Sequence, residues 1–387
     1  MLRSLKHYWR INVAVVAGAA VATAVLAGAV IVGDSMRASL RELTLDRLGR
    51  IDWALVSEDL FTTRLADDLE AALAATGQKE IVAPALMLRA SAVHTDSRAL
   101  ASGVTLAGIE DRFAAMFDSE EWRLDRLLER RSGQLFPSVV INRSLARELG
   151  AAEGDALLVS YQTATEIPRE SLLGNQPDAA AVVGMRLEIT AVLPDRGPGR
   201  FGLAPNQQTT YNAYVALADL QRRLERPGGA NALLLGSATT GPALEAEALA
   251  DAVRESATLD DLGLELEALP AGLRLSSRRF VLRDHTVTAA VEAFRADGGA
   301  TQPVLGYLAN ELRVGDLSIP YSLVLGIDGT ESATFGAVSD LGGAPIPTPG
   351  DGQIVLSQWA AEELAAQPGD RLELEYYAVG ANDELVT

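Results

Sequence analysis

Histidine and cysteine, two side chains often used in acid–base, nucleophilic and metal chemistry, are scarce or absent in this chain. The 387-residue chain has three histidines and no cysteine, and His7, His94 and His285 lie far apart without an HExxH spacing. The lack of cysteine excludes disulfides, thiolate metal sites and cysteine nucleophiles together. Asp260 and Asp261 form an adjacent acid pair, but no further ligand follows at the spacing of a metal loop, which favours a solvated turn. We therefore expect no catalytic residues, no metal site and no enzyme activity.

One glycine-rich stretch, Gly197 to Gly202, has the GxGxxG spacing of dinucleotide-binding loops and follows an expected strand. Dinucleotide binding also needs a helix that begins directly behind the glycines, so that its N-terminus faces the pyrophosphate. The residues from Leu203 to Gln208 have no helical pattern. We interpret the stretch as a loop at a subdomain edge and expect no cofactor. No Walker A sequence occurs, so any ATPase must be a separate polypeptide.

The element that organises the chain is the apolar stretch from Ile11 to Val32, which has no charged residue in 22 positions. As an α-helix it would be about 33 Å long, which matches the hydrocarbon core of a bilayer. We interpret it as a membrane-spanning helix. A cleaved secretory signal is the alternative, since a basic head precedes the stretch and small residues near Gly28 could be cleaved. Signal h-regions, however, have only about 7 to 15 apolar residues.

Small residues repeat every four positions along this span, a pattern that allows neighbouring helices to approach closely. An alanine-rich composition would produce such repeats equally well. The packing residues that the pattern predicts are Ala14, Gly18, Ala22, Ala24 and Gly28.

The charge distribution bears on orientation and partners. The chain has a formal net charge of −19, although residues 1–10 form a basic head, so binding to nucleic acid is not expected. Basic residues flank the span on both sides, so counting them does not decide the orientation of the helix in the membrane. A short basic head followed by a long folded region favours an N-terminus inside, with the main domain extracytoplasmic and the span in a bacterial inner membrane.

Beyond the span, residues 33–50 predict a stalk. Gly33, Asp34 and Ser35 supply turn and N-cap chemistry, and the apolar positions around Leu40 recur at helical spacing. We therefore expect a helix that continues past Val32, with a bend, to the end of the stalk.

The rest of the chain predicts an α+β fold made of one transmembrane helix and a large extracytoplasmic domain. Strand and helix patterns indicate a β-α-β porter-like unit at 51–95 and a second at 227–300. Between them, residues 96–226 form an inserted β-rich subdomain, and residues 301–387 repeat part of it.

The repeat is the strongest internal signal. VVINRSLARELGAAEGDALLVSY, residues 139–161, aligns without gaps with IVLSQWAAEELAAQPGDRLELEY, residues 354–376. Farther upstream, VTLAGIED around Gly108 aligns with SLVLGIDG around Gly326. Each copy predicts strand, short helix, Gly-Asp turn and strand. The predicted turn residues are Gly154, Asp155, Gly369 and Asp370.

Together the basic head, the span, GDSMRASLRELTLDRLGRID and the strand–helix–GD–strand module resemble the FtsX/MacB-like permease subunits of ABC transporters. The segment from Pro303 to Ile327 looks like part of a subgroup with longer ectodomains. Members of the family have further spans, so the resemblance implies that these residues are the N-terminal portion of a longer permease. A single-span, membrane-anchored periplasmic binding or adaptor protein is the alternative, and an anchored hydrolase is a weaker one.

The resemblance also implies a mechanism and partners. A separate cytoplasmic ATPase subunit would drive the movement of the extracytoplasmic domain through the membrane helix, a process called mechanotransmission. A homodimer or pseudo-dimer of permeases is implied, and a lipid, lipoprotein or other amphiphile would be exported or extracted.

Overall fold

The computed structural model describes residues 7–117, 124–129, 133–162, 182–204, 210–237, 244–270, 272–277, 282–327, 332–336, 338–376, 378–379 and 385–386. The chain divides into two compact units, which are described separately below. The first contains Met1–Gln162 and Val183–Ala257, and the second contains Thr163–Val182 and Thr258–Thr387.

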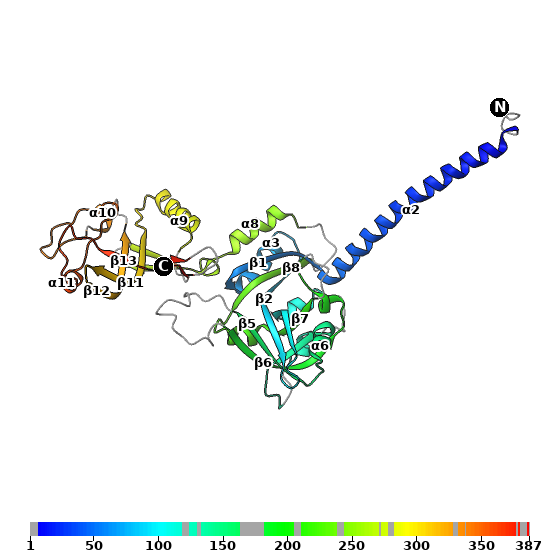
Figure 1. The fold of residues 1–387 in the computed structure, drawn as a ribbon, viewed down its shortest axis with the longest axis horizontal. Coiled ribbons are helices and arrows are strands. Elements are labelled where there is room, and N and C mark those ends of the chain that lie inside the picture. Colours follow the sequence, from blue (N-terminus) through cyan, green and yellow to red (C-terminus); the bar gives the residue numbers. More distant parts are fainter. Residues whose placement is uncertain are drawn as a thin grey trace. The chain divides into compact units, whose positions relative to one another are not determined.

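Helix α2 is continuous over 40 residues, Trp9–Leu48 (Figure 1). None of its residues is buried, and among the described residues it is the one helix long and apolar enough to cross a membrane. The expectation of a turn and N-cap at Gly33-Asp34-Ser35 was wrong, because these residues lie inside α2. Asp34 instead faces Arg37 across one helical turn, at 3.4 Å.

The first unit is built on an eight-stranded sheet with the order β1-β8-β2-β3-β7-β4-β6-β5. The chain forms β1 (Ile51–Thr62), α3 (Arg64–Ala75) and β2 (Glu80–His94) in the strand–helix–strand order expected for residues 51–95. However, β1 and β2 are not neighbours, because β8 (Gly229–Ser237) lies between them and is antiparallel to both. Helices α3 and α8 (Ala246–Ser256) pack over this part of the sheet (Figure 1).

The remaining strands close into a six-stranded barrel, because β2 pairs with β3 along one edge and with β5 along the other. Two neighbouring pairs are parallel, β3 with β7 and β4 with β6. The strands are β3 (Leu100–Ile109), β4 (Ser138–Asn142), β5 (Ala156–Gln162), β6 (Val182–Leu193) and β7 (Tyr211–Ala216). The short helices are α4 (Asp111–Ala114), α5 (Leu124–Leu128), α6 (Arg143–Leu149), α7 (Leu217–Arg223) and the 3-10 turn η4 (Gly197–Arg200).

Three hydrophobic clusters hold the first unit together. One fills the barrel and includes Leu106, Ile141 and Val215, each with 0% exposure. A second lies on the other side of the barrel strands, under α4 and η4, and the third joins α3 to the β1–β8–β2 part of the sheet. Each fully buried aliphatic or aromatic side chain contributes about 1.5–3 kcal/mol.

The second unit contains a separate three-stranded sheet with the order β12-β11-β13 and a β9–β10 hairpin. Ala309, Leu312, Ile319, Ala360 and Leu364 form its small core. Its elements are η5 (Asp260–Leu262), β9 (Leu264–Leu269), β10 (Gly272–Ser277), α9 (Asp284–Ala296), β11 (Val304–Val314), β12 (Leu317–Ile327), α10 (Ser332–Phe335), α11 (Gln358–Glu363), β13 (Glu373–Glu375), β14 (Ala378–Val379) and β15 (Leu385–Val386).

The strands expected to form a second β-α-β unit at 227–300 fall in different sheets. Strand β8 belongs to the large sheet, whereas β9 pairs with β10 in the second unit. The physical reason is that β1 and β2 occupy both edges of β8 and leave no edge for β9. The prediction that Asp260 and Asp261 lie in a solvated turn was wrong for Asp261, which is buried. Its carboxylate accepts hydrogen bonds from Thr258 N and Oγ1, at 2.9 and 2.7 Å.

The two copies of the sequence repeat form the same local structure. Asn142 Oδ1 accepts the Leu145 N–H at 3.1 Å, and Ser357 Oγ accepts the equivalent Ala360 N–H at 3.2 Å, so both caps begin a short helix. Each helix leads to a Gly-Asp turn, in which Gly154 has a φ of +93° and Gly369 a φ of +99°. The aspartate of each turn accepts the backbone N–H three residues earlier, at 2.8 Å in both copies.

Candidate functional site

The end of α2 is fixed against the domain by a glycine that no other residue can replace without strain. Gly49 has a φ of +61°, and a Cβ there would lie 2.6 Å from Met116 O and 2.8 Å from the Phe117 ring. The next residue, Arg50, donates its N–H to Met116 O at 2.9 Å. The helix therefore ends where the chain turns closely against the segment after α4.

Two polar side chains in the last turn of α2 bind the loop that contains η4. Asp46 Oδ2 accepts the Gly197 N–H at 3.2 Å, and Arg47 Nη2 donates to Ala204 O at 2.8 Å. A carboxylate that accepts a backbone N–H and a guanidinium that donates to a carbonyl form charge-assisted bonds, which are stronger than neutral ones. The last turn of α2 is thus bound to the first residue of η4 and to the segment just after η4.

The η4 loop is in turn bound to the barrel strands by buried amides. Asn142, at the end of β4, donates through Nδ2 to Gly199 O at 2.9 Å. Asn212 of β7 donates to Phe201 O at 2.9 Å, and the Tyr214 hydroxyl donates to Pro198 O at 2.5 Å. Burial raises the pKa of the Tyr214 phenol, which keeps it a neutral donor. The loop is therefore part of the barrel rather than a free surface segment.

Aromatic side chains fill the space beneath this loop. Phe113 packs against Phe117, Phe201 and Tyr214 with ring centroids 5.3, 5.2 and 5.8 Å apart. Such pairs contribute about 0.5–1.5 kcal/mol each beyond their buried area. We call Asp46, Arg47, Gly49, η4 and this aromatic cluster the α2 base. It joins a helix suited to a membrane with the core of the barrel through short polar contacts on the helix and buried contacts beneath the loop.

An ionic cluster joins the barrel to helix α3. Arg112 of α4 lies 2.9 Å from Asp67 and 3.5 Å from Glu70, both on α3, and 2.5 Å from Glu110. Burial lowers the pKa of the Arg112 guanidinium, but the contacts with Glu110 and Asp67 outweigh it, so the pKa is raised overall. Glu70 also accepts the Val82 N–H at 3.3 Å, which connects the cluster to β2.

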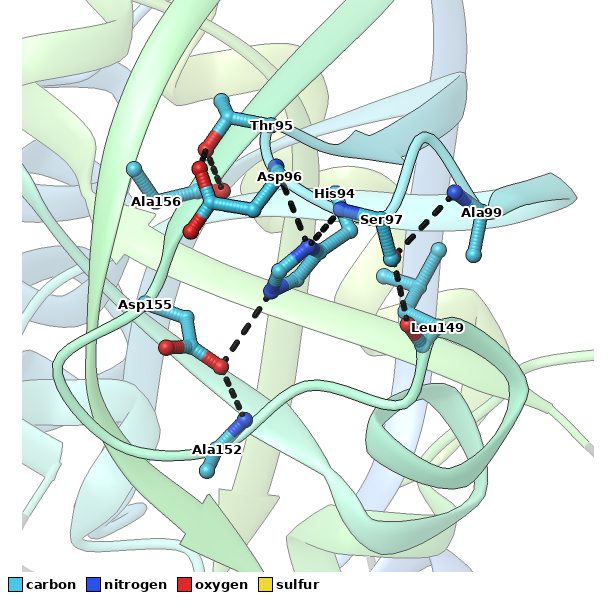
Figure 2. A network of polar contacts seen from close by, with 9 residues as sticks. All are labelled: His94, Thr95, Asp96, Ser97, Ala99, Leu149, Ala152, Asp155 and Ala156. Atoms are coloured by element: carbon cyan, nitrogen blue, oxygen red, sulfur yellow. Dashed lines mark hydrogen bonds and ion pairs between the residues drawn. The ribbon is translucent and has the colours of Figure 1, made fainter.

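The first Gly-Asp turn is part of a polar network at the end of β2 (Figure 2). The buried His94 accepts the N–H groups of Asp96 and Ser97 at Nδ1, at 3.3 and 3.0 Å. Its Nε2 lies 3.2 Å from Asp155 Oδ2, close enough to interact electrostatically although the pair is not aligned as a hydrogen bond. The Ala152 N–H and His94 lower the pKa of Asp155. The contact between His94 and Asp155 therefore holds the turn between β2 and β3 next to the turn between α6 and β5.

The structure brings only some of the predicted residues together. The small residues of α2 lie along an exposed helix, and a Cβ at Gly18 or Gly28 would meet nothing within 4 Å. Asp155 lies in the network of Figure 2 and Gly154 directly precedes it in the same turn, whereas Gly369 and Asp370 lie in the second unit. In the described part of the chain no group of three or more acidic or histidine side chains could hold a metal ion.

Sequence reasoning missed the α2 base. The glycines from Gly197 to Gly202 were interpreted as a loop at a subdomain edge, but their backbone binds Asp46 and the buried amides. A Cβ at Gly199 would lie 1.9 Å from Pro194 O, so the glycine serves a tight turn. The available signals were Asn142, directly before a helical pattern, and the acid in the last turn of the stalk. Neither reveals its distant partner.

Comparison with known families identifies the fold. The family model described as the MacB-like periplasmic core domain matches residues 13–256. The chain belongs to this family. The match contains most of α2 and ends at the last residue of α8, so the α2 base lies wholly inside the MacB-like periplasmic core domain. The resemblance to FtsX/MacB-like permeases and the α+β fold class, both expected from the sequence, are confirmed.

Solved structures from related proteins are similar at low identity. The periplasmic region of MacB from Actinobacillus actinomycetemcomitans is 9% identical, with 62% of this chain and 91% of that chain covered and a TM-score of 0.30. The extracellular domain of the noncanonic ABC-type transporter YknZ from Gram-positive bacteria is 12% identical, with 52% and 86% covered and a TM-score of 0.25. A search of curated proteins finds no match.

MacB-like periplasmic core domains belong to permeases of the ABC-transporter type. The apolar helix α2 and this domain together indicate a membrane-anchored protein whose folded part is extracytoplasmic.

Proposed function

We propose that this chain is the part of an ABC transporter permease that carries motion from a cytoplasmic ATPase subunit to the extracytoplasmic domain. The observation that supports it is the α2 base: one 40-residue helix ends in a glycine without space for a side chain, and its last turn is bonded to η4. A continuous helix resists bending, so displacement at its membrane end would move the barrel as well.

The remaining parts of the proposal follow from the sequence and α2. The basic head lies inside, next to a separate ATPase subunit, and the span lies in a bacterial inner membrane. A second permease contacts the small-residue tracks, where Gly18 and Gly28 leave open space on the helix. The substrate is a lipid, lipoprotein or other amphiphile that is exported or extracted.

The experiment inserts seven residues between Val32 and Gly33 in the assembled transporter with its ATPase. One variant receives Gly and Ser residues and the matched control receives seven strong helix formers. Seven helical residues keep the helical phase within about 20°, and both inserts add the same chain length, so the pair differs in stiffness alone. We expect the Gly/Ser variant to hydrolyse ATP but lose transport by at least about tenfold, while the helical variant transports.

Transport that is lost in both variants, or retained in both, would contradict a stiff connection. Unchanged hydrolysis and transport in every variant would favour a single-anchor binding or adaptor protein instead.

A further inference from the structure

Two arginines of α2 lie just beyond the apolar span, on the side of the folded domain. Arg37 is 5 positions and Arg41 is 9 positions after Val32, which corresponds to about 7.5 and 13.5 Å along the helix axis. Both residues are exposed. Because they are four positions apart, they lie on the same face of the helix. Two positive charges are therefore placed one above the other next to the end of the span.

The distance from one end of the span to these arginines matches a whole bilayer. At the N-terminal end, Arg10 lies 5.6 Å from the centre of the Trp9 ring, and tryptophan is enriched at the headgroup level of membranes. Arg37 is 28 positions after Trp9 in one continuous helix, which corresponds to about 42 Å. A bilayer with its headgroups is about 40–45 Å thick. When Trp9 lies at one headgroup level, Arg37 therefore lies at the other.

The direction of helical side chains brings the guanidinium groups closer to the membrane. The Cα–Cβ bonds of an α-helix tilt toward its N-terminus, and the N-terminal part of α2 is the part suited to span a membrane. Long basic side chains near the end of a span reach back to the headgroups in this way. Arg41, one turn farther from the span than Arg37, therefore reaches the same layer.

The contacts that these arginines make leave them able to bind an anion. Arg37 contacts Asp34 at 3.4 Å, but the two side chains are 84% and 68% exposed, and exposed pairs of this kind are weak. The side chain of Arg41 contacts no partner in the described part of the chain. Arg47, in the last turn, is already bound to Ala204 O. A phosphate would offer Arg37 and Arg41 charge-assisted bonds to a planar guanidinium.

The local charge is opposite to that of the whole chain. The chain has a formal net charge of −19, so an anionic bilayer surface repels it overall. Residues 33–50, however, contain four arginines and three acidic residues. The segment that emerges from the membrane is therefore positively charged, and it attracts anionic lipids.

We propose that Arg37 and Arg41 bind the phosphate groups of anionic phospholipids in the leaflet on the side of the folded domain. Charge complementarity and direct continuity with the span identify the occupant as lipid. Bound phosphates fix the depth of α2 in the bilayer and, through the α2 base, the height of the barrel above it. The inference depends on α2 as a membrane span and not on the proposed transport function.

The test measures which lipids lie next to the stalk of the full chain. A fluorescent donor is attached to Ser39→Cys, which lies between the two arginines in a chain without other cysteines. The chain is reconstituted in phosphatidylcholine nanodiscs that contain a small fraction of phosphatidylglycerol with an acceptor on its acyl chain. Energy transfer to this lipid is compared with transfer to phosphatidylcholine that carries the same acceptor. The test variant combines Arg37→Gln with Arg41→Gln.

The matched control removes two exposed arginines that form similar pairs within other helices. It combines Arg64→Gln on α3, where Arg64 pairs with Asp68, and Arg254→Gln on α8, where Arg254 pairs with Asp251. The control and the test variant therefore change the net charge equally. Circular dichroism checks that both fold, and a variant with Arg37→Lys and Arg41→Lys keeps the charge at the stalk.

We expect transfer to phosphatidylglycerol to exceed transfer to phosphatidylcholine at least about twofold. The excess should disappear in the glutamine variant, persist in the control and be partly retained with lysine. Salt at about 0.5 M should reduce it, because exposed charges are screened. Equal transfer to the two lipids in the parent chain, or an excess that remains without the two arginines, would overturn the proposal.

Discussion

At the scale of single residues, Gly49 is the position of the α2 base where we expect a substitution to cost the most stability. Its φ of +61° favours glycine, and the space that a side chain needs is occupied by Met116 O and the Phe117 ring. Many other glycines of the chain have positive φ but open surroundings, so conformation and packing can be separated experimentally.

We expect Gly49→Ala to lower the free energy of unfolding by about 2–4 kcal/mol, because left-handed strain and a steric clash add. Gly77→Ala is the control. Gly77 has a φ of +85° with nothing within 4 Å, so only the strain of about 1–2 kcal/mol should appear. Urea denaturation in detergent micelles measures the free energy of unfolding of each variant. Equal decreases for Gly49→Ala and Gly77→Ala would contradict the packing role of Gly49.

At the scale of elements, the Gly-Asp turn between α6 and β5 predicts a pH dependence. The pKa of Asp155 lies below its ordinary value of 3.8, because the Ala152 N–H and His94 favour the carboxylate. The carboxylate therefore stabilises the fold above the unfolded-state pKa, and this contribution is lost as the pH falls through the lower folded-state value.

Asp155→Asn should accordingly unfold at lower urea concentration than the wild type at pH 7, and the difference should shrink as the pH falls below about 4. Asp370→Asn removes the corresponding negative charge in the second copy, where the described contact of the carboxylate is with Gln367 N. It should affect the barrel little. A difference for Asp155→Asn that persists unchanged to pH 2.5 would contradict this account.

The sequence predicted elements better than their partners. Apolar periodicity located the span, α3, most barrel strands and the repeat, because those signals are local. It failed at Gly33, where the helix continues through a weak turn signal. It also failed at β8, whose paired residues in β1 and β2 lie roughly 150 to 185 residues earlier in the chain. The contacts of Asp46 with Gly197 and of Asn142 with Gly199 span 151 and 57 residues, which no spacing rule reveals.

At the scale of the whole molecule, the proposed function requires that the N-terminus lie inside the cell and the folded domain outside. The chain contains no cysteine, so single cysteines can be introduced without background. We expect Ala75→Cys, at an exposed position at the end of α3, to react with a membrane-impermeant maleimide in intact spheroplasts. Ser4→Cys, in the basic head, should react only after lysis. Labelling of Ser4→Cys in intact cells, or release of a mature protein without the span, would contradict an inward N-terminus.

The position of β8 also has a consequence for biogenesis. Strands β1 and β2 reach the far side of the membrane early in translocation, but the strand that separates them emerges only after the whole barrel sequence. Until then the edges of β1 and β2 that pair with β8 would lack their partner strand. Extracytoplasmic chaperones and quality-control proteases would meet the protein at that stage, and slow synthesis between residues 95 and 229 would lengthen the exposure.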